Sequence, residues 1–405
     1  MTTLFKNFLI SAVLLFTLLI INKESYSVTD TLRAGKDNTL YENDFGQISN
    51  GKGQYMFAGT TAGNQIRRAV ISFGVKDLIP PGAVITGVKL VLNMSKTISG
   101  SKRVKLYKAA KNWGEGDSDA FGEEGGGTGA DNSDATWIHT YYDTAYWDSP
   151  GGDYDASESA QTNVDNVGFY TWTDPQMTAD VQDWIDNVTP DFGWIIIGDE
   201  SEFATAKRFD TKDNPNPAVR PRLIVTYTFN GIAMRLKALT EGLTEKGGMV
   251  SDTFRVYLRN SFSPYSVVDV AKSYHTLDSW FVFSNASPGT YYIEVDQRNS
   301  INTWSKLPQI FTAGLPYKNY NFTSAASQAY GNNLVLQDAY YCIYSGDVNK
   351  DNNINLTDVI SVSNSSNVFQ AGYVVQDVTG NNLVDLTDLL VTYNNATLFI
   401  IEQRP

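Results

Sequence analysis

Hydrophobic and polar residues alternate in short runs along most of the chain, and this two-residue period is typical of half-buried β-strands. Early runs at residues 68–75, 84–94 and 103–107 are rich in β-branched residues. Further runs follow at residues 168–172, 194–197, 222–228, 253–258, 280–283, 289–295 and 309–311. Gly, Pro, Asn and Ser lie between them and favour turns. We therefore expect a mainly β protein.

One segment of the N-terminal half has a helical period instead. Asp174 offers an N-cap, and Pro175 suits the first helical position. Apolar residues then recur on one face, namely Met177, Val181, Trp184, Ile185 and Val188. Many strands with a single packed helix favour a jelly roll or a β-sandwich.

Near the C-terminus the pattern changes to a repeat. Residues 347–358 read DVNKDNNINLTD, and residues 377–388 read DVTGNNLVDLTD, 30 residues later. Apolar residues follow each copy at helical spacing: Leu356, Val359 and Ile360 in the first, and Leu386, Leu389, Leu390 and Tyr393 in the second. The repeat predicts two loops, each followed by a helix.

The repeated loops carry oxygen-bearing side chains at the spacing that calcium uses. A twelve-residue calcium loop supplies ligands from positions 1, 3, 5, 7, 9 and 12. In the first loop these are Asp347, Asn349, Asp351, the carbonyl of Asn353, Asn355 and Asp358. In the second they are Asp377, Thr379, Asn381, the carbonyl of Leu383, Asp385 and Asp388. We expect calcium as the cofactor, with Ile354 and Val384 as core anchors at position 8. The alternative is a pair of solvated Asp/Asn-rich turns.

A duplicated loop and helix with Asp at position 12 resembles a type I dockerin over residues 345–397. The resemblance implies attachment to a cohesin-like or other surface protein. It assigns the partner contacts to Leu356, Thr357, Leu386 and Thr387. The loops depart from the family at position 6, where Asn352 and Asn382 replace Gly. Asn is the next best residue for left-handed backbone, so we expect weakened binding, at roughly 10⁻⁶ to 10⁻⁴ M, with the first loop tighter.

The N-terminal half resembles the DNRLRE-type module of secreted bacterial proteins. The resemblance covers residues 28–229 and rests on ordered motifs at residues 67–73, 79–85, 134–137, 147–153, 180–184, 192–194, 206–210 and 220–227. It implies a jelly roll, and some relatives are carbohydrate-binding modules. Trp137, Tyr141 and Trp147 are the candidates for stacking on a polysaccharide, while core packing is the alternative role of such rings.

Residues 230–344 form a second run of short strands, which predicts an Ig-like or transthyretin-like sandwich. We interpret it as a spacer or partner-facing domain without chemistry. The helical pair is expected at residues 345–397. The remaining residues, 398–405, are expected to be a C-terminal tail.

Residues 1–27 have the three parts of a secretory signal peptide. Lys6 precedes an apolar run at residues 8–21, and Ser25-Tyr26-Ser27 supplies a small-x-small cleavage site. The run is short for a membrane span, which needs about 20 apolar residues. We expect a secreted or cell-surface protein without a membrane span after cleavage.

Composition narrows the function further. A net charge of −13 argues against nucleic acid as a partner. The single cysteine excludes an intramolecular disulfide, and only two histidines, His139 and His275, are available for catalysis. Because no catalytic motif is recognisable, we expect a non-catalytic protein that binds polysaccharide and docks on a partner. The alternatives are a structural surface or matrix protein, and a cryptic carbohydrate-active enzyme. The acidic, Gly-rich segment 114–134 is either a solvated loop or a cation-binding loop.

Overall fold

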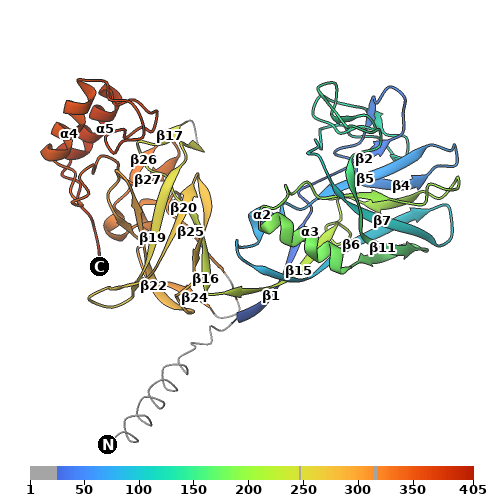
Figure 1. Cartoon of the computed structure of the whole chain (residues 1–405), viewed down its shortest axis with the longest axis horizontal. Coiled ribbons are helices and arrows are strands. Elements are labelled where there is room, and N and C mark those ends of the chain that lie inside the picture. The colour runs from blue at the N-terminus through green and yellow to red at the C-terminus, as the bar shows by residue number, and fades with distance from the viewer. Residues whose placement is uncertain (1–24, 246–247, 313–314, 316) are drawn as a thin grey trace, which may run out of the picture. The chain divides into compact units, whose positions relative to one another are not determined.

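The computed structural model describes residues 25–245, 248–312, 315 and 317–405. The chain divides into two compact units, Ser27–Phe229 and Asn230–Pro405 (Figure 1). Most of the expected signal peptide, residues 1–24, lies outside the described residues, and the expected cleavage point after Ser27 falls within the first strand. Within the described ranges, no helix has the length and apolar character that a membrane crossing needs.

The first unit is built almost entirely from strands. In chain order its elements are β1 (Ser25–Arg33), β2 (Lys36–Tyr41), β3 (Ile48–Ser49), β4 (Tyr55–Thr60), β5 (Ile66–Ser72), α2 (Val75–Leu78), β6 (Val84–Thr97), β7 (Lys102–Ala109), β8 (Thr128–Gly129), β9 (His139–Tyr141), β10 (Ala145–Tyr146), β11 (Tyr154–Val164), β12 (Gly168–Trp172), α3 (Pro175–Ile185), β13 (Trp194–Ile197), β14 (Lys207–Asp210) and β15 (Arg222–Asn230). The main sheet has the order β1-β15-β6-β14-β4-β5-β13-β7-β11, with β12 beside β6 and β2 beside β5. The expected strands at 194–197 and 222–228 are confirmed, and alternate residues of β15 are buried as the pattern predicts.

Helix α3 confirms most of the helical prediction. The Asp174 carboxylate accepts the Gln176 N–H, so it caps the helix, and Pro175 occupies the first turn. Four of the expected apolar residues are buried, but Val188 lies beyond the end of the helix and is 69% exposed. The helix ends earlier because Asn187 adopts left-handed backbone, with φ 57°.

The second unit joins a β-sandwich to a helical pair. Its elements are β16 (Ile232–Lys237), β17 (Thr244–Glu245), β18 (Gly248–Met249), β19 (Asp252–Asn260), β20 (Val267–His275), β21 (Asp278–Phe283), β22 (Gly289–Gln297), β23 (Thr303–Trp304), β24 (Gln309–Phe311), β25 (Tyr317–Asn321), η1 (Ala326–Gln328), η2 (Tyr330–Asn332), β26 (Val335–Gln337), β27 (Tyr340–Cys342), α4 (Leu356–Ser366) and α5 (Leu386–Thr397). A three-stranded sheet, β21-β16-β25, and a five-stranded sheet around β19 and β22 contribute to one apolar core.

The helical segment is not separated from the sandwich. Ile354, at position 8 of the first loop, belongs to the same core as Phe254 and Phe283 of the sandwich. The residues after α5 also pack, because Glu402 Oε1 accepts the Trp304 indole N–H at 2.6 Å. The expected boundary at 344/345 and the expected C-terminal tail at 398–405 both lie inside one compact unit.

Candidate calcium-binding loops

The two repeated loops share an unusual backbone. Position 6 is left-handed in both, with φ 65° at Asn352 and 66° at Asn382. Position 4 is left-handed too, at Lys350 and Gly380. Such backbone is costly for most side chains and less so for Asn and Gly. The structure thus agrees with Asn as the substitute for the family's Gly at position 6.

The last carboxylate of each loop closes the loop onto its helix. The Asp358 carboxylate is fully buried and accepts the Val348 N–H at 3.0 Å and the Asn355 N–H at 3.0 Å. Asp388, also fully buried, accepts the Thr379 N–H at 2.8 Å and the Asp385 N–H at 2.9 Å. Each Asp is therefore both position 12 of a loop and a capping-box residue of the following helix.

The first carboxylate of each loop is also buried. Asp347 accepts the Asn352 N–H at 3.1 Å, and Asp377 accepts the equivalent Asn382 N–H at 3.1 Å. Burial raises the pKa of Asp347 to about 6, and burial likewise raises the pKa of Asp377. A carboxylate that has lost its water is stabilised in its charged form by a nearby cation. The donor set and its burial therefore fit a hard, oxygen-seeking ion.

The side chains at positions 3, 5 and 9 currently support the turns. The amide oxygen of Asn349 accepts the Asp351 N–H at 2.8 Å. Asn355 and Asp385, at position 9, cap their helices by accepting N–H groups at 2.7 Å. The structure does not draw three carboxylates of either loop within 4.8 Å of one another; in the described part of the chain, that arrangement occurs at Asp37, Glu115 and Asp213. A bound cation would have to draw the loop oxygens inward.

The similarity of this chain to known proteins is weak and partial. Neither a protein-family model nor a curated protein matches the chain. Two solved structures of type II cohesin-X-dockerin complexes from Acetivibrio cellulolyticus, a C-terminal and an N-terminal interface mutant in that order, are similar to part of it. They are 13% identical, cover 42% and 43% of this chain and 100% and 97% of their own, and have TM-scores of 0.27 and 0.25. At these TM-scores the likeness carries no argument about fold or function.

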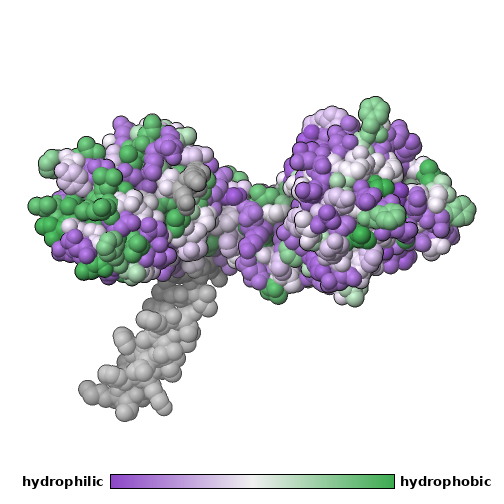
Figure 2. All heavy atoms as spheres, turned by 90° about the horizontal axis from the view of Figure 1, so that it is seen from above, coloured by the Kyte–Doolittle hydropathy of each residue, from purple (hydrophilic) through white to green (hydrophobic). Residues whose placement is uncertain are grey.

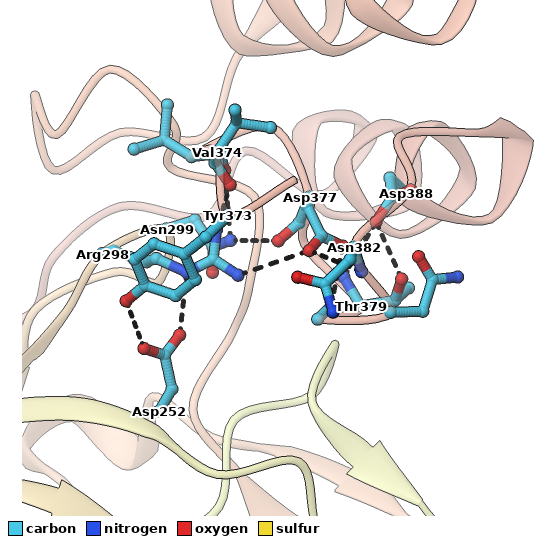
Figure 3. A network of polar contacts seen from close by, with 12 residues as sticks. Asp252, Arg298, Asn299, Tyr373, Val374, Asp377, Thr379, Asn382 and Asp388 are labelled. Carbon is cyan, nitrogen blue, oxygen red and sulfur yellow. Dashed lines mark hydrogen bonds and ion pairs between the residues drawn. The ribbon is translucent and has the colours of Figure 1, made fainter. Parts of the chain in front are cut away.

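The second loop is tied to the sandwich by a network that the sequence did not reveal (Figure 3). Arg298, just after β22, bonds the Asp252 carboxylate at 2.8 Å and lies 3.7 Å from the Asp377 carboxylate. The Asn299 amide donates to the Asp377 carbonyl at 2.9 Å, and Tyr373 donates to Asp252. No spacing rule connects residues 252, 298 and 377, so only the fold could bring them together.

The first loop is tied to the sandwich by Lys350. Its ammonium group donates to the carbonyls of Gln297 and Ser300 at 2.9 and 2.5 Å, and it lies 3.0 Å from the Asp296 carboxylate. A single basic residue in an acidic loop was the one sequence signal for this contact. Both loops are therefore held against the end of β22 and the residues that follow it.

Helices α4 and α5 expose large apolar side chains although Val362, Leu389 and Val391 pack in a small apolar core. Their buried residues are mostly polar, namely Asp358, Val362, Ser365 and Ser366 in α4, and Asp388, Thr392 and Asn395 in α5. Their exposed residues include large apolar ones: Leu356, Ile360, Leu386, Leu390 and Tyr393, each more than half exposed. Thr357 and Thr387 are exposed as well. Figure 2 shows apolar side chains gathered at the end of this unit where the two helices lie.

The expected sugar-stacking surface is not formed. Trp137 and Trp147 are 9% and 5% exposed and belong to a core cluster with Trp113. The Trp147 indole donates to the Thr136 carbonyl at 2.9 Å, and the Arg68 guanidinium covers the Trp137 ring. Only Tyr141 keeps partial exposure. This expectation is corrected for Trp137 and Trp147, because rings buried in a core cannot stack on a sugar.

The acidic segment 114–134 is anchored rather than free. Glu124 is 5% exposed, and its carboxylate accepts hydrogen bonds from the Asn50 side-chain amide and from the backbone N–H groups of Gln54 and Tyr55.

The two histidines are buried and make structural hydrogen bonds. His139 contacts Thr136, and His275 bonds the Ala238 carbonyl inside the sandwich.

Proposed function

We propose that this is an exported, non-catalytic protein whose C-terminal unit docks on a partner protein through calcium-organised helices. The observation that carries the proposal is the set of large apolar side chains that α4 and α5 expose. A helix in a globular unit normally turns its large apolar side chains toward the core. Here Leu356 and Leu386 point to solvent at the same position of both repeats, 68% and 75% exposed.

The partner that fits this surface is a protein with an apolar patch of its own. Contiguous exposed aliphatic side chains mark interaction sites, because burying them releases water. Neither α4 nor α5 contains a Lys or Arg residue, which argues against nucleic acid as the partner. The resemblance to dockerins makes a cohesin-like domain the first partner to test.

Calcium is the proposed organiser of this surface. The loops place carboxylates and carbonyls immediately before the first exposed residue of each helix. Asp358 and Asp388 belong at once to the loop and to the helix, so loop closure sets the direction of the helix. Binding of an ion is expected to stabilise both.

Calorimetric titration of the full chain with calcium tests the metal part. We expect two sites in the C-terminal unit, the first tighter because Asn349 and Asp351 are better ligands than Thr379 and Asn381. Asp347→Ala should lower the affinity more than Asp377→Ala, and the exposed Asp44→Ala is the matched control. If the heat of calcium binding were identical in the wild type and in the double variant Asp347→Ala/Asp377→Ala, the proposal would be refuted.

A pull-down with a type I cohesin, in calcium and in chelator, tests the docking part. Leu356→Ser combined with Leu386→Ser should abolish capture and leave calcium binding intact. Phe262→Ser, an equally exposed apolar residue of the sandwich, should leave capture unchanged. Calcium-independent capture, or capture unaffected by the double variant, would count against this surface.

Polysaccharide binding was expected at Trp137 and Trp147, but both rings are buried, so they no longer support it. The proposal therefore rests on docking alone and leaves the first unit as the cargo that is docked.

A further inference from the structure

Three carboxylates meet inside the first unit, away from the C-terminal loops. Asp37 lies in β2, Glu115 follows β7, and Asp213 follows β14. One oxygen from each lies within 4.8 Å of the others. We call this group the Asp37 cluster. Like charges at such distances repel strongly unless a cation separates them.

One oxygen of the Asp37 cluster has no donor. Asp37 is fully buried; its Oδ2 accepts the Lys212 backbone N–H at 2.8 Å, whereas its Oδ1 has no hydrogen-bond partner in the described part of the chain. A buried acceptor without a donor is unfavourable, and such an oxygen usually binds an ion or a water molecule. Burial, opposed by that N–H and reinforced by the Glu115 charge, raises the pKa of Asp37 to about 8.

The basic residues nearby leave this charge only partly balanced. The Lys212 ammonium lies 3.1 Å from Glu115 and 2.8 Å from Asp213, so one cation faces three acids. The Lys36 ammonium is directed to other acceptors, the Asn112 side chain and the Trp113 carbonyl. Lys212 therefore pairs directly with Glu115 and Asp213, while its charge acts on Asp37 from a greater distance.

A cavity adjoins the cluster at Lys212 and Asp213, whereas Asp37 and Glu115 do not line it. This cavity of about 310 Å³ is lined by Lys212 and Asp213 together with Arg33, Pro217 and Arg220. The Lys212 side chain is 21% exposed, so it can swing toward this cavity. An ion could then enter along the path that the lysine leaves.

We propose that Asp37, Glu115 and Asp213 form a calcium site, which is filled when the Lys212 ammonium moves aside. All the donors are oxygens, and neither His nor Cys belongs to the cluster, which favours a hard cation over zinc. The site lies wholly within the first unit and is independent of the proposed docking loops.

Terbium luminescence on the full chain tests the site, because Trp113 lies two residues from Glu115 and can sensitise a bound lanthanide. To remove signal from the C-terminal loops, the chain should carry Asp347→Ala and Asp377→Ala. We expect saturable emission excited through tryptophan and reversed by calcium. Asp37→Asn and Asp213→Asn should each weaken it at least tenfold, whereas Asp119→Asn, an exposed acid of the same segment, should not.

The variant Lys212→Met distinguishes a calcium site from a cluster in which Lys212 alone balances the three carboxylates. If the lysine competes with calcium, the variant should bind calcium at least threefold more tightly than its parent. If the lysine is the permanent counter-ion, the variant should bind no calcium and melt at a lower temperature, and the proposal would be overturned. Thermal melts of every variant show whether a lost signal reflects misfolding, and Asp213→Asn, at a partly exposed position, provides a second reading if Asp37→Asn fails to fold.

Discussion

The Arg298 guanidinium lies 3.7 Å from the Asp377 carboxylate and so links the sandwich to the first residue of the second candidate calcium-binding loop. The same guanidinium bonds Asp252, and both acids are at most 3% exposed. We expect Arg298→Ala to lower the free energy of unfolding of the C-terminal unit by about 3–5 kcal/mol, because two buried carboxylates would lose their cation. Urea unfolding of the full chain, followed by hydrogen exchange in residues 373–388, measures this.

Arg255→Ala is the matched control for that prediction. Arg255 pairs with Asp296 in the same sandwich, but its side chain is half exposed, so its loss should cost less than about 1 kcal/mol. Equal losses in the two variants would mean that Arg298 acts as an ordinary surface residue.

Asn352→Gly should stabilise the first loop by about 0.5–1 kcal/mol. Asn352 has φ 65°, a conformation that glycine adopts without steric cost, and its buried Oδ1 has no hydrogen-bond partner in the described part of the chain. Thermal unfolding in chelator reports the change. Asn364→Gly, at an exposed position in the last turn of α4, should instead destabilise slightly, by about 0.3 kcal/mol. A destabilised Asn352→Gly would show that the Asn side chain has a role other than backbone conformation.

Trp147→Ala should destabilise the first unit by about 3–5 kcal/mol, as expected for removal of a buried aromatic side chain. Phe121, which is fully exposed in the acidic segment, offers the comparison, and Phe121→Ala should change stability by less than about 0.5 kcal/mol. A folded, fully stable Trp147→Ala protein would mean that the ring is available at the surface after all.

The C-terminal unit should lose stability in acid through His275. Burial lowers the pKa of this imidazole from 6.5 to about 4, so the unfolded chain takes up a proton first. Stability is fully present above pH 6.5 and is lost as the pH falls toward 4, by a total on the order of 3 kcal/mol. Urea titrations at several pH values would show a shallower loss in His275→Gln. An unchanged slope would assign the acid sensitivity to other groups.

Local patterns predicted the elements of this protein better than their assembly. The strands at 194–197 and 222–228, the cap at Asp174 and the loop–helix repeat depend on neighbours in sequence, and all were expected. The outward direction of Leu356 and Leu386 was implied by the dockerin resemblance and not by the period, because a helical period shows that residues share a face but not which way that face points. The rings of Trp137 and Trp147 were misassigned for the same reason. Contacts such as Arg298 with Asp377 depend on how distant strands pair.

Ile354 limits how the helical pair can be transferred between proteins during evolution. Because this loop residue is buried among sandwich side chains, the helical pair would expose part of that core if it were moved alone into another protein. A gene rearrangement that transfers the proposed docking surface in a folded state must therefore carry the sandwich with it. The sandwich and the helical pair would then be transferred together, and the sequence of the sandwich would be constrained by the helices that it contacts.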